Sequence, residues 1–163
     1  MSWAKKGKKK NKVGGQFLAL PHAVLKSVNF TMLSAKAVKL LIDIAVQYSG
    51  TNNGNLQAAW AYMEKRGWKS RDTLGVALKE LLHYGFIEKT RQGNLYVCSL
   101  YALTWHPIHL CNVEYDIGIK PSPISSGKWQ PQKRKFVAKK KNASTEFVID
   151  QHDSRDDGAR MAA

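Results

Sequence analysis

Residues 70–94 read SRDTLGVALKELLHYGFIEKTRQGN and carry the clearest structural signals in the chain. Ser70 is a good helix N-cap, because its hydroxyl can accept a hydrogen bond from a backbone N–H of the first turn. Asp72 follows in that turn, where its charge is favourable to the helix dipole. Gly85 suits the left-handed residue that ends many helices. These signals predict a helix over residues 71–84, whose apolar side consists of Leu74, Ala77, Leu78, Leu81 and Leu82.

A β-hairpin is predicted directly after this helix. Residues 86–90 read as a strand, residues 91–94 as a turn and residues 95–105 as the returning strand, with an irregularity near Cys98 and Ser99. Gly93 is expected to supply a positive φ in the turn.

Three further helices and one short strand are predicted upstream. Pro21 opens a short helix over residues 21–28. Ser34 caps the next helix, which Gly50 and its polar neighbours end, and residues 55–57 leave room for a very short strand. A helix over residues 58–66 follows, and Gly67 ends it. The core-facing stripe of the helix after Ser34 consists of Ala37, Val38, Leu41, Ile44, Ala45 and Tyr48.

This order of elements indicates an α+β fold that is mainly α with a small β-hairpin. Two helices joined by a short glycine-containing turn form a helix-turn-helix, and a hairpin directly after the second helix corresponds to a wing. The major groove of B-DNA admits one helix, and a helix that buries one side and leaves its N-terminus accessible can enter it. The sequence therefore predicts a winged helix-turn-helix that binds duplex DNA with residues 71–84.

The candidate DNA contacts come from the polar side of this helix and from the hairpin. Thr73 and Val76 carry methyl groups that can touch thymine, whereas Arg71 and Lys79 can reach guanine edges or phosphates. His83 lies on the same side, and Glu80 is expected to be solvated or ion-paired. The candidate contacts are Lys69, Ser70, Arg71, Asp72, Thr73, Val76 and Lys79 around the helix, and Lys89, Arg91, Gln92 and Asn94 in the hairpin.

Several short stretches within residues 16–106 are typical of one family. They are NGNL at 53–56, Trp60, RGW at 66–68, SRDTL at 70–74, ALKEL at 77–81, GFI at 85–87 and RQG at 91–93. On these residues the chain resembles winged helix-turn-helix proteins of bacterial genomes and mobile elements. It is also similar to the winged-helix domains of plasmid and phage replication initiators. The resemblance implies the winged fold and DNA binding, but one architecture hosts many biological roles.

The charge is strongly positive, at +14 from 26 Lys and Arg against 12 Asp and Glu. This excess favours a polyanionic partner, through phosphate contact and counterion release. We expect a basic disordered arm at residues 1–15, the domain at residues 16–120 and a flexible tail at residues 121–163. Residues 128–141 of that tail are basic and residues 143–163 acidic, so most of the excess charge lies in the arm and the tail.

Other classes of function find little support in the sequence. No Gly-rich phosphate loop, nucleophile elbow or zinc-protease motif is present, so we expect neither an enzyme nor a cofactor. Cys98, His106, His109 and Cys111 lack the spacing of a metal knuckle, so no metal is expected. No apolar run approaches the ~20 residues of a membrane span. The expected location is the cytoplasm of a bacterial cell, in association with the nucleoid.

Three biological roles stay open at this point. The first is a transcriptional regulator, in particular a repressor that binds a pseudo-palindrome as a homodimer. The second is a plasmid or phage replication or partition accessory that binds origin repeats and recruits a protein through its C-terminal tail. The third is a winged helix used for contact with an inhibited protein rather than with DNA.

Overall fold

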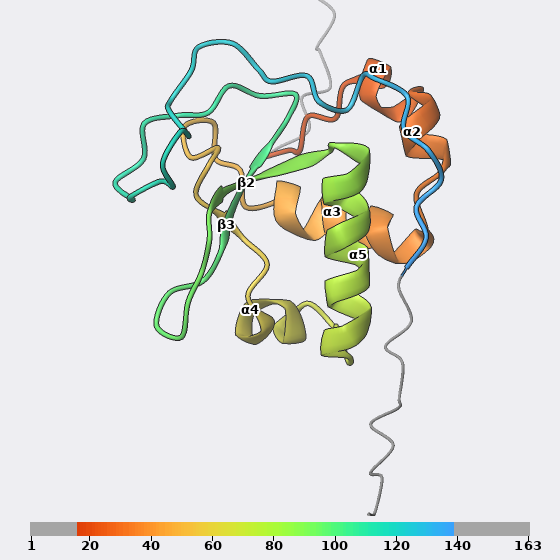
Figure 1. Cartoon of the computed structure of the whole chain (residues 1–163), viewed down its shortest axis with the longest axis horizontal. Helices are drawn as coiled ribbons and strands as arrows, with labels where there is room; N and C mark the ends of the chain where they lie inside the picture. The colour runs from red at the N-terminus through yellow and green to blue at the C-terminus, as the bar shows by residue number, and fades with distance from the viewer. Residues whose placement is uncertain (1–15, 139–163) are drawn as a thin grey trace, which may run out of the picture.

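The computed structural model describes residues 16–138, which fold into five helices and one three-stranded antiparallel sheet (Figure 1). This confirms the α+β class. The arm expected at residues 1–15 and the acidic segment expected at residues 143–163 lie outside the described residues. The helices are α1 (His22–Leu25), α2 (Val28–Thr31), α3 (Ala35–Ala45), α4 (Trp60–Lys65) and α5 (Arg71–Tyr84), and the strands are β1 (Leu56–Gln57), β2 (Ile87–Arg91) and β3 (Leu100–Leu103).

Helix α5 has the bounds that the sequence predicts. The Ser70 hydroxyl accepts a hydrogen bond from the backbone N–H of Thr73 at 3.2 Å, and Gly85 ends the helix in the left-handed conformation with φ 74°. The expected apolar side is buried at Leu74, Ala77 and Leu81, whereas Leu78 and Leu82 are only partly buried.

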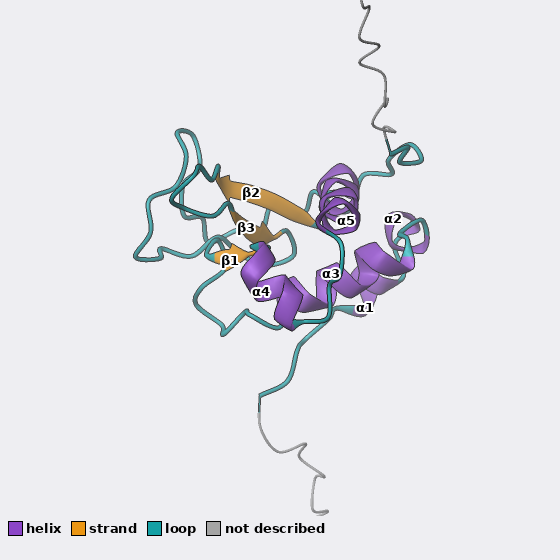
Figure 2. Ribbon diagram, turned by 90° about the horizontal axis from the view of Figure 1, so that it is seen from below, coloured by secondary structure: helices purple, strands orange, loops and turns teal. Residues whose placement is uncertain are grey.

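Helix α3 packs against α5 and supplies much of the core. Ser34 caps it as predicted, because its hydroxyl accepts a hydrogen bond from the backbone N–H of Ala37 at 3.2 Å. The helix ends at Ala45, so Tyr48 lies beyond it. Leu40, which the predicted stripe omits, is fully buried together with Leu41 and Ile44. The core therefore lies between α3, α5 and the sheet (Figure 2).

The single helix predicted over residues 21–28 is wrong. Two one-turn helices, α1 and α2, replace it, because Ser27 has an extended backbone with φ −67° and ψ 146°. The Ser27 hydroxyl accepts a hydrogen bond from the backbone N–H of Phe30 at 3.3 Å and starts the second helix. A side chain that caps a new helix interrupts the previous one.

The sheet has the strand order β1-β3-β2. Leu56 of β1 pairs with Tyr101, and Ile87 of β2 pairs with Leu103. The irregularity expected near Cys98 and Ser99 lies instead in β2, between Lys89 and Arg91. There Thr90 is fully buried, and its hydroxyl donates to the carbonyl oxygen of Gly54 at 2.6 Å.

The returning strand is much shorter than the predicted range 95–105. Leu95 and Tyr96 are 95% and 93% exposed at the tip of the hairpin. The Asn94 side chain accepts hydrogen bonds from the backbone N–H groups of Tyr96 and Val97 at 2.8 and 3.1 Å, so a local turn replaces strand pairing. Gly93 does not take the positive φ that we expected. Its role is close approach, since a Cβ there would lie 2.5 Å from the Ser99 nitrogen.

The expectation of a flexible tail from residue 121 onward is wrong for the part that the structure describes. Residues 127–138, which we call the strap, pack across the domain and place Trp129 and Phe136 against the core. The strap begins where the backbone N–H of Gly127 donates to the carbonyl oxygen of Thr104 at 2.9 Å. It then passes α2 and runs down beside α5, on the side opposite the hairpin (Figure 1). None of the helices within residues 16–138 is long and apolar enough to cross a membrane.

Candidate nucleic-acid interface

The turn between α4 and α5 is held onto α3 by a buried carboxylate. Oδ1 of Asp43 accepts two hydrogen bonds from Arg66, at 3.1 and 2.9 Å. Oδ2 accepts one from the indole of Trp68 at 2.8 Å and one from the Lys39 ammonium at 2.6 Å. Burial raises the pKa of Asp43, but the hydrogen bonds from Lys39, Trp68 and Arg66 lower it, and the net pKa lies below its usual value. Asp43 is thus ionised at neutral pH and fixes the orientation of α5 relative to α3.

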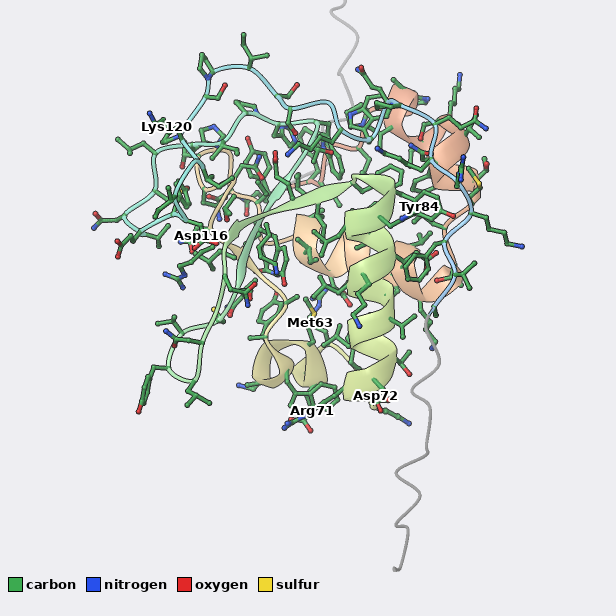
Figure 3. The ribbon with its side chains drawn as sticks, viewed as in Figure 1. Met63, Arg71, Asp72, Tyr84, Asp116 and Lys120 are labelled. Carbon is green, nitrogen blue, oxygen red and sulfur yellow. The ribbon has the colours of Figure 1, made fainter. Side chains whose placement is uncertain are left out.

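The first turn of α5 carries several of the predicted contacts at one end of the molecule. Lys69, Ser70, Arg71 and Asp72 are all exposed there. The Arg71 guanidinium lies 5.3 Å from the ring centroid of Trp60 in α4, a cation–π contact that restricts its orientation. The loop of the hairpin, α4 and the first turn of α5 all lie along the lower edge of the molecule (Figures 1 and 3).

The outward face of α5 holds the remaining predicted helix contacts. Lys79 is exposed, Val76 is 39% exposed and Thr73 is half-buried. Glu80, which we expected to be solvated or ion-paired, is buried instead. Its two oxygens accept hydrogen bonds from the backbone N–H and the hydroxyl of Ser34, at 2.6 and 2.7 Å.

The four predicted contact residues of the hairpin differ in their exposure and in their hydrogen bonds. The Lys89 ammonium donates to the Gln92 side chain at 2.6 Å, and both residues are exposed. Arg91 is half-buried and donates to the carbonyl oxygen of Cys98 at 3.1 Å, across the hairpin. Asn94 organises the turn with its side chain. Lys89 and Gln92 therefore remain available at the surface, whereas Arg91 and Asn94 stabilise the hairpin itself.

Two hollows lie along the flank of α5 that faces away from the hairpin. The first, of about 370 Å³, adjoins the turn before α5, and its lining includes Lys36, Lys39 and Lys69. The second, of about 550 Å³, lies between α5 and the strap, and its lining includes Val76, Lys36 and Lys135. Lys36 and Thr73 line both hollows.

Lys36 and Lys135 are surface cations that the sequence analysis did not place near α5. Lys36 lies close to α5 because Glu80 binds Ser34, which brings the start of α3 against α5. Lys135 lies there because the strap packs on α5. The ring of His83, expected to face DNA, contacts the strap: Nε2 of His83 lies 2.7 Å from the carbonyl oxygen of Arg134.

The soft-ligand residues of the second half of the chain do not gather into a metal site. The Cys98 thiol lies 3.6 Å from the Gln57 side chain, whereas the His106 ring stacks on Tyr48 with 4.4 Å between ring centroids. Burial lowers the pKa of His106, and the neighbouring His109 lowers it further. Across residues 16–138, no three His, Cys, Asp or Glu side chains are arranged to hold a metal ion.

The site thus consists of an exposed helix face, an exposed hairpin on one side of it and a lysine-lined flank on the other. No family model, curated protein or solved structure matches the chain.

Proposed function

We propose that this protein is a winged helix-turn-helix protein that binds duplex DNA and acts as a transcriptional regulator. Helix α5 enters the major groove with Arg71, Thr73, Val76 and Lys79, and the β2–β3 hairpin is the wing. Lys89 and Gln92 of the wing then meet the DNA backbone or the minor groove. No catalytic step is part of this role.

The observation that carries the proposal is the placement of α5. The inner side of α5 is buried, and the turn that precedes it is bonded to Asp43. The first helical turn of α5 and its outer face are exposed beside the hairpin. A fixed helix with an accessible N-terminus can insert into the major groove. The net charge of +14 supplies the attraction to phosphate that such binding needs.

The test is selection from a pool of random duplexes with the full-length protein. An enriched motif is the expected result, and a two-fold repeat in it would support the homodimeric regulator. Arg71→Ala should cost about 1–3 kcal/mol on the preferred duplex and relax the choice of base at one position, because a good base contact is worth that much. Lys120→Ala is the matched control, since Lys120 is exposed and lies far from α5 (Figure 3).

The other roles predict different results in the same experiments. Clustered sites at a replication origin, without an effect on promoter activity, would indicate the replication accessory. Binding that enriches no motif and is unchanged by Arg71→Ala would contradict base reading by α5 and favour contact with a protein.

A further inference from the structure

The flank of α5 that faces away from the hairpin presents lysines from three separate elements. Lys69 belongs to the turn before α5, Lys36 to the first turn of α3 and Lys135 to the strap. All three are exposed, and none forms an ion pair with a carboxylate among residues 16–138. In contrast, Lys39, which lines the smaller hollow with Lys36 and Lys69, forms an ion pair with Asp43. The flank therefore keeps free positive charge beside the helix.

The strap is fixed to the domain by specific hydrogen bonds, so the position of Lys135 is defined. The buried Asn29 side chain of α2 donates to the carbonyl oxygens of Trp129 and Pro131, at 2.8 and 2.9 Å. It also accepts from the backbone N–H of Lys133 at 2.9 Å. Close to α5, the backbone N–H of Phe136 donates to the Tyr84 hydroxyl at 3.0 Å.

Two carboxylates lie among these lysines, and both belong to the lining of the larger hollow. Glu80 lines the larger hollow, but both of its oxygens are bound to Ser34. Asp72 also lines that hollow, at the first turn of α5. The smaller hollow is lined by lysines with no Asp or Glu among its lining residues. The flank is therefore most positive next to the turn.

We propose that Lys36 and Lys135, together with Lys69, contact phosphates of one DNA strand at the edge of the major groove that α5 occupies. This inference rests on the proposed DNA binding and extends it. The wing lies on the other side of α5, so the helix would be held between two phosphate-contacting surfaces. Contacts to phosphates fix the position and orientation of a reading helix but carry no sequence information.

The first experiment compares two double variants that remove the same charge from the full-length protein. Lys36→Gln with Lys135→Gln removes the proposed contacts. Lys26→Gln with Lys120→Gln is the control, because both lysines are exposed and line neither hollow. Affinity for the selected duplex is measured over a range of salt concentrations.

A plot of log affinity against log salt concentration should be less steep for the first double variant, by about 2 in slope. Each lost phosphate contact reduces the slope by roughly 0.9. Affinity near 0.1 M salt should fall roughly fivefold to tenfold per contact, and the selected motif should not change. The control pair should change the slope by well under 1. Equal slopes for the two double variants, or no change in either, would overturn the inference.

The second experiment changes the position of Lys135 without changing the net charge of the protein. Asn29→Ala removes the three hydrogen bonds that hold the strap. It should weaken DNA binding severalfold in protein whose circular dichroism shows it folded at the assay temperature. Lys135→Gln should then add less loss to Asn29→Ala than to the wild type. Additive losses would show that Lys135 acts through net charge alone and would contradict the proposed contact.

Failure of the two proposals can be told apart. If Arg71→Ala relaxes the choice of base at one position while Lys36→Gln with Lys135→Gln leaves the salt slope intact, only the flank inference is wrong. If the wild-type protein selects no motif and Arg71→Ala has no effect, the proposed reading of DNA by α5 itself is wrong.

Discussion

The indole of Trp68 and the carboxylate of Asp43 lie 25 positions apart in the chain and share a buried hydrogen bond of 2.8 Å. Trp68 belongs to the turn that precedes α5, and Asp43 belongs to α3. The bond therefore transmits the position of α3 to the helix that we propose to read DNA. A change at Asp43 should alter that helix without touching its surface.

Asp43→Asn should lower the free energy of unfolding by about 1–3 kcal/mol, because it weakens hydrogen bonds to a charged acceptor in a buried place. The measurement is urea denaturation followed by tryptophan fluorescence. Glu64→Gln is the matched control, since Glu64 is an exposed carboxylate of α4. A loss of the same size in both variants would contradict the structural role of Asp43.

The Asp43 carboxylate should also make the stability of the protein depend on pH. The pKa of Asp43 is lowered in the folded protein from its usual 3.8, so its contribution is complete above that pH and declines as the pH falls towards the folded value. The unfolding free energy should therefore drop below about pH 4, and the drop should be smaller in Asp43→Asn. Parallel acid curves for the two proteins would show that other groups cause the loss.

His106 should titrate below its usual pKa of 6.5, because burial and the charge of His109 both disfavour its protonated form. Its contribution to stability is complete above pH 6.5 and is lost as the pH falls through its folded pKa. Proton NMR of the imidazole C–H signals measures the pKa directly. A His106 midpoint at or above 6.5 would mean that the ring is not packed on Tyr48 as described.

Two glycines that differ in their surroundings give opposite expectations for alanine. At Gly93 a Cβ would lie 2.5 Å from the Ser99 nitrogen, so Gly93→Ala should destabilise the protein by about 1–3 kcal/mol. At Gly75, inside α5, a Cβ meets nothing within 4 Å, and alanine should stabilise by about 0.5–1 kcal/mol. Thermal denaturation of both variants checks the signs, and a stabilising Gly93→Ala would contradict the described turn.

The ion pair between Lys128 and Glu88 connects the strap to β2. The Lys128 ammonium lies 2.6 Å from Oε2 of Glu88, whose side chain is 8% exposed. Lys128→Met leaves that carboxylate buried without its partner and should cost about 1–3 kcal/mol in urea denaturation. Adding Glu88→Gln should recover part of the loss, because the buried charge is then gone. If the double variant is no more stable than Lys128→Met alone, the unpaired carboxylate is not the cause of the loss.

Local signals in the sequence predicted the parts of the fold that local hydrogen bonds determine. Ser34, Ser70 and Gly85 begin or end helices through contacts within a few residues, and their predicted positions agree with the structure. The hairpin tip was mispredicted because Leu95 and Tyr96 are residue types that favour strands. Asn94 overrides that preference with its own hydrogen bonds to the following turn.

The strap was missed for a different reason. Trp129 and Phe136 show no helical or strand periodicity, and the strap backbone is bonded to residues far away in the sequence, among them Asn29 and Tyr84. Such an arrangement leaves no pattern within residues 121–138 themselves. The same is true of the candidate site, where Lys36 and Lys135 approach α5 only through tertiary packing.

The bond between Asn29 and Lys133 joins positions 104 apart, which has a consequence for the order of events during synthesis. When α2 leaves the ribosome, its partner has not yet been translated, and Asn29 stays hydrated until the last part of the described chain emerges. Contacts of such long sequence separation slow folding. The helices and the sheet can assemble first, and docking of the C-terminal residues then completes the domain. A nascent chain thus completes the surface that we propose to bind DNA only after residues 127–138 have been translated.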